Sequence, residues 1–104
     1  MRILHTMLRV GDLQRSIDFY THVLGMRLLR TSDNPQYQYT LAFLGFGSNP
    51  EHPELESPYN YGVHQYELGT AYGHLAIAVP DPAAAGARIH APGAILLRPA
   101  SPAR

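Results

Sequence analysis

HTMLRVGDLQRSIDFYTHVLGMRL, at residues 5–28, decides the fold of this chain, because its pattern returns as HLAIAVPDPAAAGARIHAPGAIL at residues 74–96. His5 opens the first stretch and His74 opens the second, and in both an aspartate and then a glycine follow at nearly the same spacing. Such self-similarity is typical of a duplicated structural unit. The sequence therefore predicts two related modules that follow one another along the chain.

The first module is expected to fill residues 1–60 in the order β-α-β-β-β. Alternating or β-rich side chains predict its strands at residues 3–10, 26–32, 36–45 and 54–60. After the first strand, Gly11-Asp12 supplies a turn and an N-cap for a helix that ends at Gly25. Pro58 indicates that the last strand lies at a sheet edge or carries a bulge, since proline cannot donate a ladder hydrogen bond.

The second module repeats only part of this order. This partial module occupies residues 72–97. A polar linker at 61–71 precedes it, and a tail at 98–104 follows it. Within it we expect a strand at 72–79, a helix at 82–90 that is capped by Asp81, and the beginning of another strand. The whole chain, 1–104, is thus predicted to be a single α+β domain of paired βαβββ modules, of which the second is incomplete.

The composition excludes several classes of function. Eight arginines balance eight acidic residues, so the chain has no net field that would gather nucleic acid or an anionic membrane. The absence of cysteine excludes disulfides, a thiolate metal site and a cysteine nucleophile, and any metal must therefore take nitrogen and oxygen ligands. Since no apolar run approaches the roughly 20 residues of a membrane span and the chain opens directly into a strand pattern, we expect a cytoplasmic protein.

His5, Glu56 and His74 form a candidate metal site. The two histidines occupy the same position in the duplicated strands, and Glu56 lies on a predicted strand that would face the same cleft. Two imidazoles and one carboxylate suit a borderline divalent cation such as Zn²⁺, Ni²⁺, Co²⁺ or Fe²⁺. A matching acid at the same interval after His74 would fall near position ~125, whereas no acidic residue follows Asp81 in this sequence.

Each candidate also has a plainer interpretation. An isolated histidine usually has a structural role, and Glu56 lies near Glu51 and Glu54 in a polar stretch where acids commonly face solvent. Arg9 shares the face of His5 and could clamp a substrate carboxylate, or it could end a strand with its head in water. Asn60 could orient a substrate or cap a turn before Gly62.

The stretch RILHTMLRVGDLQRSIDFYTHVLGMRLLRTSDNPQYQYTLAFLGFG, with YNYGVHQYELGTAYGHLAIAV further on, closely resembles bacterial glyoxalase I, the lactoylglutathione lyases of the vicinal oxygen chelate superfamily. The resemblance extends from residue 1 to about residue 80. It implies paired βαβββ modules in a homodimer, with a divalent metal in a site that both subunits form. It also implies the conversion of the hemithioacetal of methylglyoxal and glutathione to S-lactoylglutathione.

The resemblance further assigns roles to residues. His5, Glu56 and His74 match three of the four metal ligands of that family, and Arg9 and Asn60 match residues that hold the glutathione part of the substrate. It implies Ni²⁺ or Co²⁺ as the cofactor, with Zn²⁺ less effective. A carboxylate would move a proton between adjacent carbons of the substrate, and Glu56 is the catalytic candidate in this chain.

The sequence departs from the family in two places. ELESPYN at 54–60 has Ser57 and Pro58 where the family has a Leu-Thr-like pair, and the final strands with the fourth ligand and base are expected to be missing from a C-terminally truncated chain. We therefore expect reduced activity and reliance on dimerisation, since sheet edges are left unpaired. Two alternatives stay open, namely a metal-free small-molecule binding module of the same superfamily and a remnant that folds but catalyses nothing.

Overall fold

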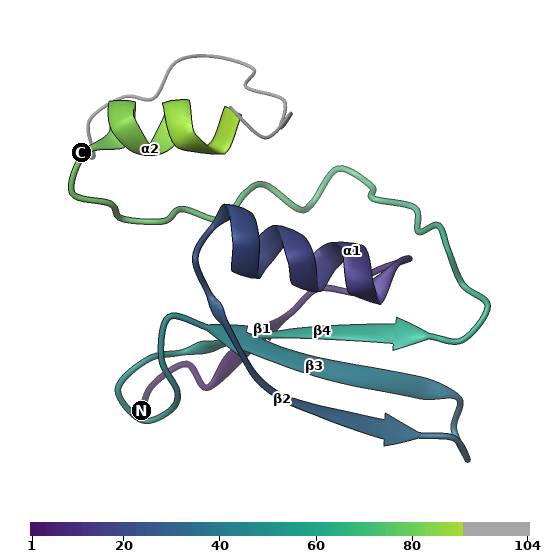
Figure 1. The fold of residues 1–104 in the computed structure, drawn as a ribbon. Helices are drawn as coiled ribbons and strands as arrows, with labels where there is room; N and C mark the ends of the chain where they lie inside the picture. Colours follow the sequence, from purple (N-terminus) through teal and green to yellow (C-terminus); the bar gives the residue numbers. More distant parts are fainter. Residues whose placement is uncertain (91–104) are drawn as a thin grey trace. The chain divides into compact units, whose positions relative to one another are not determined.

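The structure is a computed structural model that describes residues 1–90, and it divides the chain into two compact units, Met1–Glu67 and Leu68–Arg104. The boundary falls inside the segment 61–71 that was expected to link the modules. Figure 1 shows the course of the chain.

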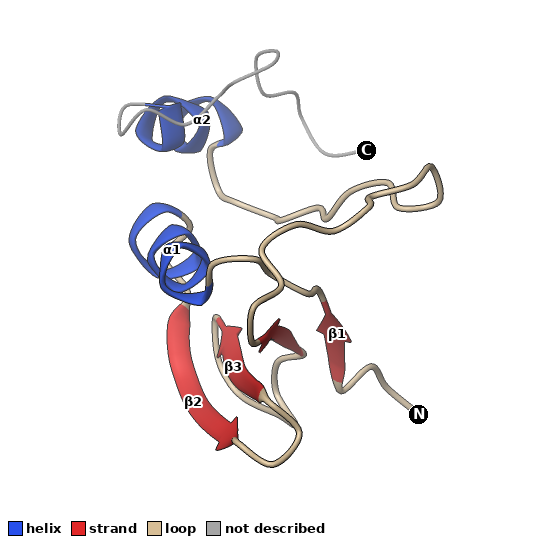
Figure 2. Ribbon diagram, turned by 90° about the vertical axis from the view of Figure 1, so that its right-hand side faces the viewer, coloured by secondary structure: helices blue, strands red, loops and turns tan. Residues whose placement is uncertain are grey.

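The first unit has the predicted order β-α-β-β-β. Its elements are β1 (His5–Met7), α1 (Leu13–Asp18), the π-helix η1 (Phe19–Val23), β2 (Arg27–Asn34), β3 (Tyr39–Gly45) and β4 (Glu54–Asn60). The four strands form one sheet in the order β1-β4-β3-β2, and in Figure 2 the unlabelled strand between β1 and β3 is β4. Strand β1 runs parallel to β4, and the other pairs are antiparallel. The α+β class and the four strands of the first module are confirmed.

The backbone pairing of β1 is longer than its three assigned residues. The Glu54 N–H donates to the Leu4 carbonyl at 3.0 Å, and the Val10 N–H donates to the Pro58 carbonyl at 3.0 Å. The chain therefore runs beside β4 from Leu4 to Val10, close to the predicted span 3–10. This pairing places His5 beside β4, which is distant from it in sequence.

The predicted helix is present but changes its winding. Asp12 caps α1 through its side chain, which accepts from the Arg15 N–H at 3.1 Å. From Phe19 onward the helix widens into a π turn, and the Thr21 hydroxyl donates to the Ile17 carbonyl at 2.7 Å. Such a local hydroxyl bond competes with the regular backbone ladder. Helical structure stops before Gly25, whose φ of 79° is the left-handed conformation that favours glycine at a helix end.

The position of β4 corrects the expectation drawn from Pro58. Instead of an edge strand, β4 is an interior strand between β1 and β3, and Pro58 lies in regular register opposite Leu41. The Pro58 carbonyl accepts from Val10, so its missing N–H faces β1 and not β3. Proline is tolerated here because only the bond toward the short outer strand is lost.

The sheet has one face packed on α1 and one face that carries polar groups. The packed face of β3 and β4 consists of two register pairs with no more than 6% exposure, Ala42 with Ser57 and Leu44 with Leu55. Helix α1 lies over the sheet on this side (Figure 1). Because side chains alternate along a strand, the pair Phe43 and Glu56 points to the opposite face.

Ser57 offers a test of this packing. Its side chain is fully buried, and its hydroxyl has no hydrogen-bond partner among the described residues. We expect Ser57→Ala to raise the free energy of unfolding by about 1 kcal/mol, because an unpaired buried hydroxyl is removed. Urea titration checks this value, with Ser32→Ala on the exposed part of β2 as the control. A destabilised Ser57→Ala protein would contradict the assignment.

The second unit, described as far as His90, contains the predicted helix but not the predicted strand before it. Helix α2 (Pro82–His90) begins with Asp81 as its cap, since the Asp81 carboxylate accepts from the Ala84 N–H at 3.2 Å. Residues 72–79 are irregular, so the expected strand is wrong. A strand exists only through pairing with a neighbour, and no strand of the described residues pairs with this segment. The further strand that was expected to begin after this helix and the tail at 98–104 lie outside the described residues. No helix within residues 1–90 is long and apolar enough to cross a membrane.

Candidate metal centre

His5 and Glu56 meet on the polar face of the first sheet. The parallel pairing of β1 with β4 places them on neighbouring strands, and the Nε2 atom of His5 lies 3.4 Å from the Oε2 atom of Glu56. The Glu56 side chain is 11% exposed and the His5 side chain 44% exposed, so the pair has one buried and one accessible partner. The interpretation of Glu56 as a solvent-facing acid is therefore wrong.

The spacing of these two atoms fits a shared divalent cation. Two donor atoms that bind one cation at about 2.1 Å stand about 3.0 to 3.4 Å apart on adjacent corners of an octahedron or tetrahedron. The observed 3.4 Å lies within this range. An imidazole nitrogen and a carboxylate oxygen also form the donor chemistry that a borderline cation prefers.

Glu54 shares the face of Glu56 but has different partners. One of its carboxylate oxygens accepts from the Arg30 guanidinium at 2.7 Å, and the other accepts from the Asn49 backbone N–H at 3.1 Å. Because both oxygens are engaged, this carboxylate is held away from the His5 imidazole. Of the two neighbouring acids, only Glu56 points a carboxylate oxygen at His5.

The same contacts lower the pKa of Glu54 from its ordinary value, first through the hydrogen bond from Arg30 and then through that from Asn49. A lowered folded-state pKa contributes stability that is complete above the unfolded value of about 4.3 and is lost as the pH falls through the folded value. We expect wild-type stability to drop on acidification below that range, and the drop to be smaller in Glu54→Gln. Urea midpoints between neutral and acid pH measure this, with the exposed Glu51→Gln as the control. Parallel acid profiles of wild type and Glu54→Gln would contradict it.

Arg9 and Asn60 lie on the same sheet face as the pair. Arg9 is exposed beyond β1, in the stretch that still runs beside β4, and it has the parity of His5. Asn60 ends β4 with the parity of Glu56, and its side-chain amide donates to the Tyr66 hydroxyl at 3.2 Å. The backbone thus places four of the five predicted site residues on one face.

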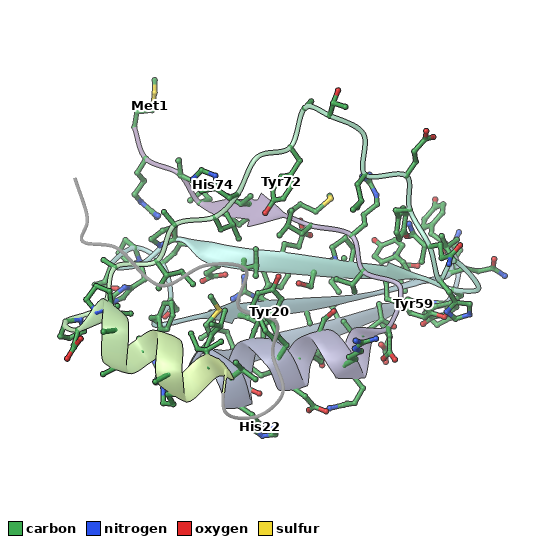
Figure 3. The ribbon with its side chains drawn as sticks, turned by 90° about the horizontal axis from the view of Figure 1, so that it is seen from above. Met1, Tyr20, His22, Tyr59, Tyr72 and His74 are labelled. Carbon is green, nitrogen blue, oxygen red and sulfur yellow. The ribbon has the colours of Figure 1, made fainter. Side chains whose placement is uncertain are left out.

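His74, the fifth, belongs to the second unit. It is exposed and lies on the irregular stretch that also carries Tyr72 (Figure 3). Within the described part of the first unit, histidine and acidic side chains do not gather in a group of three that could hold a metal ion. The metal role of His74 stays a prediction, as do the roles of His5, Glu56, Arg9 and Asn60.

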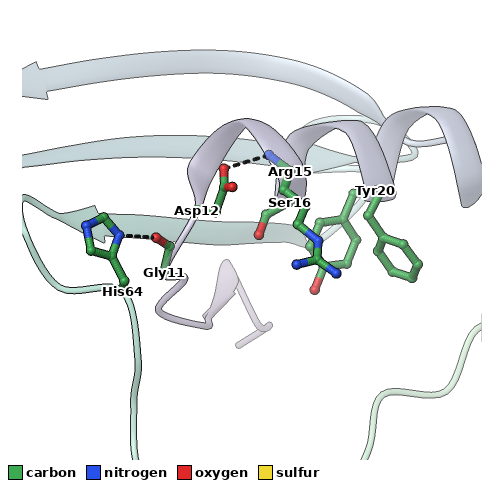
Figure 4. A pocket seen from close by; sticks show the side chains of 7 residues that line it. Gly11, Asp12, Arg15, Ser16, Tyr20 and His64 are labelled. Atoms are coloured by element: carbon green, nitrogen blue, oxygen red, sulfur yellow. Dashed lines mark hydrogen bonds between the residues drawn. The ribbon is translucent and has the colours of Figure 1, made fainter.

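A separate open pocket of about 580 Å³ lies at the start of α1. It is lined by Gly11, Asp12, Arg15, Ser16, Phe19, Tyr20 and His64 (Figure 4). The His64 ring nitrogen Nδ1 lies 3.0 Å from the Gly11 carbonyl oxygen, and a Cβ on Gly11 would come within 2.2 Å of the His64 carbonyl. Glycine is therefore required for this close approach. The lining of this pocket includes none of the residues predicted for the metal site.

Arg30 is the residue of this face that sequence reasoning missed. It pairs in register with Phe43, and its guanidinium carbon lies 4.1 Å from the centroid of that ring. The one available signal was Glu54, because a buried carboxylate that shares a face with Glu56 requires a cationic partner. An irregularity between Leu28 and Arg30 in β2 sets which face Arg30 occupies, and simple alternation does not reveal it.

Comparison with known proteins places this geometry in a family. The chain matches the model of the Glyoxalase/Bleomycin resistance protein/Dioxygenase superfamily over residues 2–102. It is 60% identical over 104 residues to a lactoylglutathione lyase of Escherichia coli O157:H7, covering 100% of this chain and 77% of that relative. A lactoylglutathione lyase of Haemophilus influenzae is 59% identical with the same coverage.

Solved structures of glyoxalase I enzymes also resemble this chain. A glyoxalase I structure from Zea mays superposes with a TM-score of 0.92 and 45% identity, covering 99% of this chain and 37% of that chain. A structure from a study of trypanothione-dependent Leishmania major glyoxalase I gives a TM-score of 0.84 and 52% identity, covering 88% of this chain and 66% of that one.

The chain therefore belongs to the Glyoxalase/Bleomycin resistance protein/Dioxygenase superfamily. Within that superfamily it falls among the lactoylglutathione lyases, the glyoxalase I enzymes, because its relatives at 57 to 60% identity carry that name. The non-catalytic binding module is not favoured, since these relatives are lyases. The chain spans 77% of the length of these curated relatives.

Proposed function

We propose that this protein acts as a lactoylglutathione lyase that converts the hemithioacetal of methylglyoxal and glutathione to S-lactoylglutathione, and thereby detoxifies methylglyoxal. The observation that carries the proposal is the His5–Glu56 pair, with 3.4 Å between its donor atoms, in a chain 60% identical to a lactoylglutathione lyase. The reaction is an isomerisation. A proton leaves the carbon bonded to sulfur and arrives at the adjacent carbon. The hydroxyl oxygen of the first carbon loses its proton and the carbonyl oxygen of the second gains one, so that a thioester and a new hydroxyl group result.

His5 and Glu56 would hold a divalent cation together with His74. When bound, a Ni²⁺ or Co²⁺ ion supplies a Lewis acid that polarises the substrate oxygens and makes the neighbouring C–H bond more acidic. Imidazole and carboxylate ligands are compatible with these ions and with Zn²⁺, which we expect to be less effective. Metal dependence is a property of glyoxalase I enzymes, whereas the identity of the ion in this chain is part of the proposal.

Glu56 is the proposed base. Its carboxylate lies on an interior strand with little exposure, which limits competition from water for the transferred proton. It would accept the proton from the first carbon and return it to the second. Arg9 and Asn60, on the same face, would hold the carboxylate and amide groups of the glutathione part, through a guanidinium and a side-chain amide respectively.

The second half of the site is proposed to come from His74 and from a second copy of the chain. In a homodimer the substrate would lie at the subunit interface. The edge position of β1, which carries His5, supports this assembly, since its outer side is left unpaired within the described residues. The cytoplasmic location expected from the sequence stays a prediction.

Metal removal and addition test the proposal. We expect chelator-treated protein to show no formation of S-lactoylglutathione from methylglyoxal and glutathione, and stoichiometric Ni²⁺ to restore it more fully than Zn²⁺. Thioester absorbance measures turnover, and the relatives named above serve as positive controls. Turnover that is indifferent to chelation and metal addition would contradict the metal mechanism, and an absence of turnover with bound metal would favour the inactive remnant.

A further inference from the structure

We propose that Arg30, anchored by Glu54, is a positioning residue that holds the imidazole of His5 toward Glu56 by acting through the ring of Phe43. The proposal rests on the proposed metal role of His5, and it assigns a function to two charged residues that the reaction itself does not use. It concerns only the first unit of the chain.

The His5 imidazole depends on side-chain contacts for its direction. Its strand β1 is the outer strand of the sheet, and the side chain is 44% exposed, so packing does not enclose it. The ring contact that does constrain it is with Phe43, at 5.9 Å between centroids and 82° between planes. Such an edge-to-face contact has a preferred geometry, and it therefore limits rotation of the imidazole.

Phe43 is itself held from its other neighbour. The guanidinium carbon of Arg30 lies 4.1 Å from the Phe43 ring centroid, within the range of a cation–π contact. A planar guanidinium stacks on an aromatic face in a way that a lysine ammonium does not reproduce. The two residues pair across β2 and β3, so the backbone register also brings them together.

Glu54 fixes the guanidinium in this place. The Arg30 side chain is 54% exposed and would otherwise move freely in water, but it donates to the 3% exposed Glu54 carboxylate at 2.7 Å. The Asn49 N–H secures the second oxygen of that carboxylate. The contacts thus run from Glu54 through Arg30 and Phe43 to His5. Glu54 and His5 are also register partners on the neighbouring strands β4 and β1.

This arrangement differs from an ordinary surface ion pair in what it predicts. A pair that only stabilised the sheet would change the unfolding free energy when removed, but it would leave the direction of the His5 ring unchanged. A positioning role requires that loss of the flat guanidinium, with the charge retained, loosens the imidazole. Arg30→Lys makes this change, and Arg27→Lys is the matched control because Arg27 is an exposed arginine on the same strand.

The test uses two measurements on the full chain. In metal-free protein, nuclear Overhauser contacts between the His5 and Phe43 rings should be clear in wild type and in Arg27→Lys, and weaker in Arg30→Lys. Competition with a chelator should show a rise of about tenfold in the Ni²⁺ Kd for Arg30→Lys and for Phe43→Leu, as for loss of a residue that orients a metal ligand. The double variant should be little worse than either single variant, since both act along one path.

Unchanged ring contacts in Arg30→Lys would overturn the proposal, as would weakened contacts with an unchanged Ni²⁺ Kd. Equal effects of Arg27→Lys and Arg30→Lys would also overturn it, because they would indicate a general charge effect. A wild-type chain that binds no Ni²⁺ would contradict the proposed function instead, and the ring contacts alone would then decide the role of Arg30.

Discussion

Glu56→Gln is expected to lower kcat by about a thousandfold while leaving the fold intact. Loss of a positioned general base alone costs roughly a hundredfold to ten-thousandfold. Glutamine has the same shape and can fill the same place on β4, but its amide cannot accept the proton and carries no charge for a cation. The Glu56 side chain is buried on the polar face with its oxygen 3.4 Å from His5 Nε2, so no exposed acid can readily replace it.

The measurement is turnover of the hemithioacetal with Ni²⁺ content determined in the same sample. Glu51→Gln is the matched control, because Glu51 is an exposed acid in the turn that precedes β4. It should retain wild-type kcat. A Glu56→Gln protein with a normal rate would remove Glu56 from the mechanism. A slow variant that still holds one Ni²⁺ per chain would separate the base role from the ligand role.

His74→Gln is expected to weaken Ni²⁺ binding by about a hundredfold or more, since loss of a direct ligand should exceed the tenfold to hundredfold cost of losing an orienting residue. The substitution should not affect stability, because His74 is exposed on an irregular stretch. This variant therefore reports on the metal without a folding defect. It also tests whether the second unit supplies a ligand.

Chelator competition gives the Kd, and circular dichroism checks the fold. His22→Gln is the control, since His22 is exposed and projects outward from the helical segment of the first unit (Figure 3). An unchanged Kd in His74→Gln would show that the ligand set lies elsewhere, even if His5 and Glu56 both bind the ion. Equal weakening in His22→Gln would indicate nonspecific binding to surface histidines.

Local sequence patterns predicted the first unit well because its signals agree with one another. Alternation set the strands, and Asp12 and Gly25 mark the two ends of the helical segment as expected. The edge or bulge expected from Pro58 was wrong. Proline lacks an N–H for the ladder, but the sequence does not show which neighbouring strand that N–H would have faced. The strand at 72–79 was wrong for a different reason. Its residues favour extended structure, but a strand needs a neighbour, and pairing is not a local property.

The candidate site was predicted in part. Duplication pointed to His5 and His74, and shared parity put Glu56 on the face of Glu54, which the structure confirms for the pair on β4. Position in the sequence could not tell which of the two acids would be free to face His5. That choice depends on Arg30, which reaches Glu54 from a strand with an irregular register.

The parallel pairing of β1 with β4 has a consequence for how the protein folds. The strand that carries His5 joins the sheet beside the strand that lies farthest from it along the first unit, and not beside its neighbour in sequence. The two donor atoms can therefore meet only after a long loop has closed, and closing that loop costs chain entropy. A cation held between them would bind the closed chain and not the open one, so it would stabilise the folded unit.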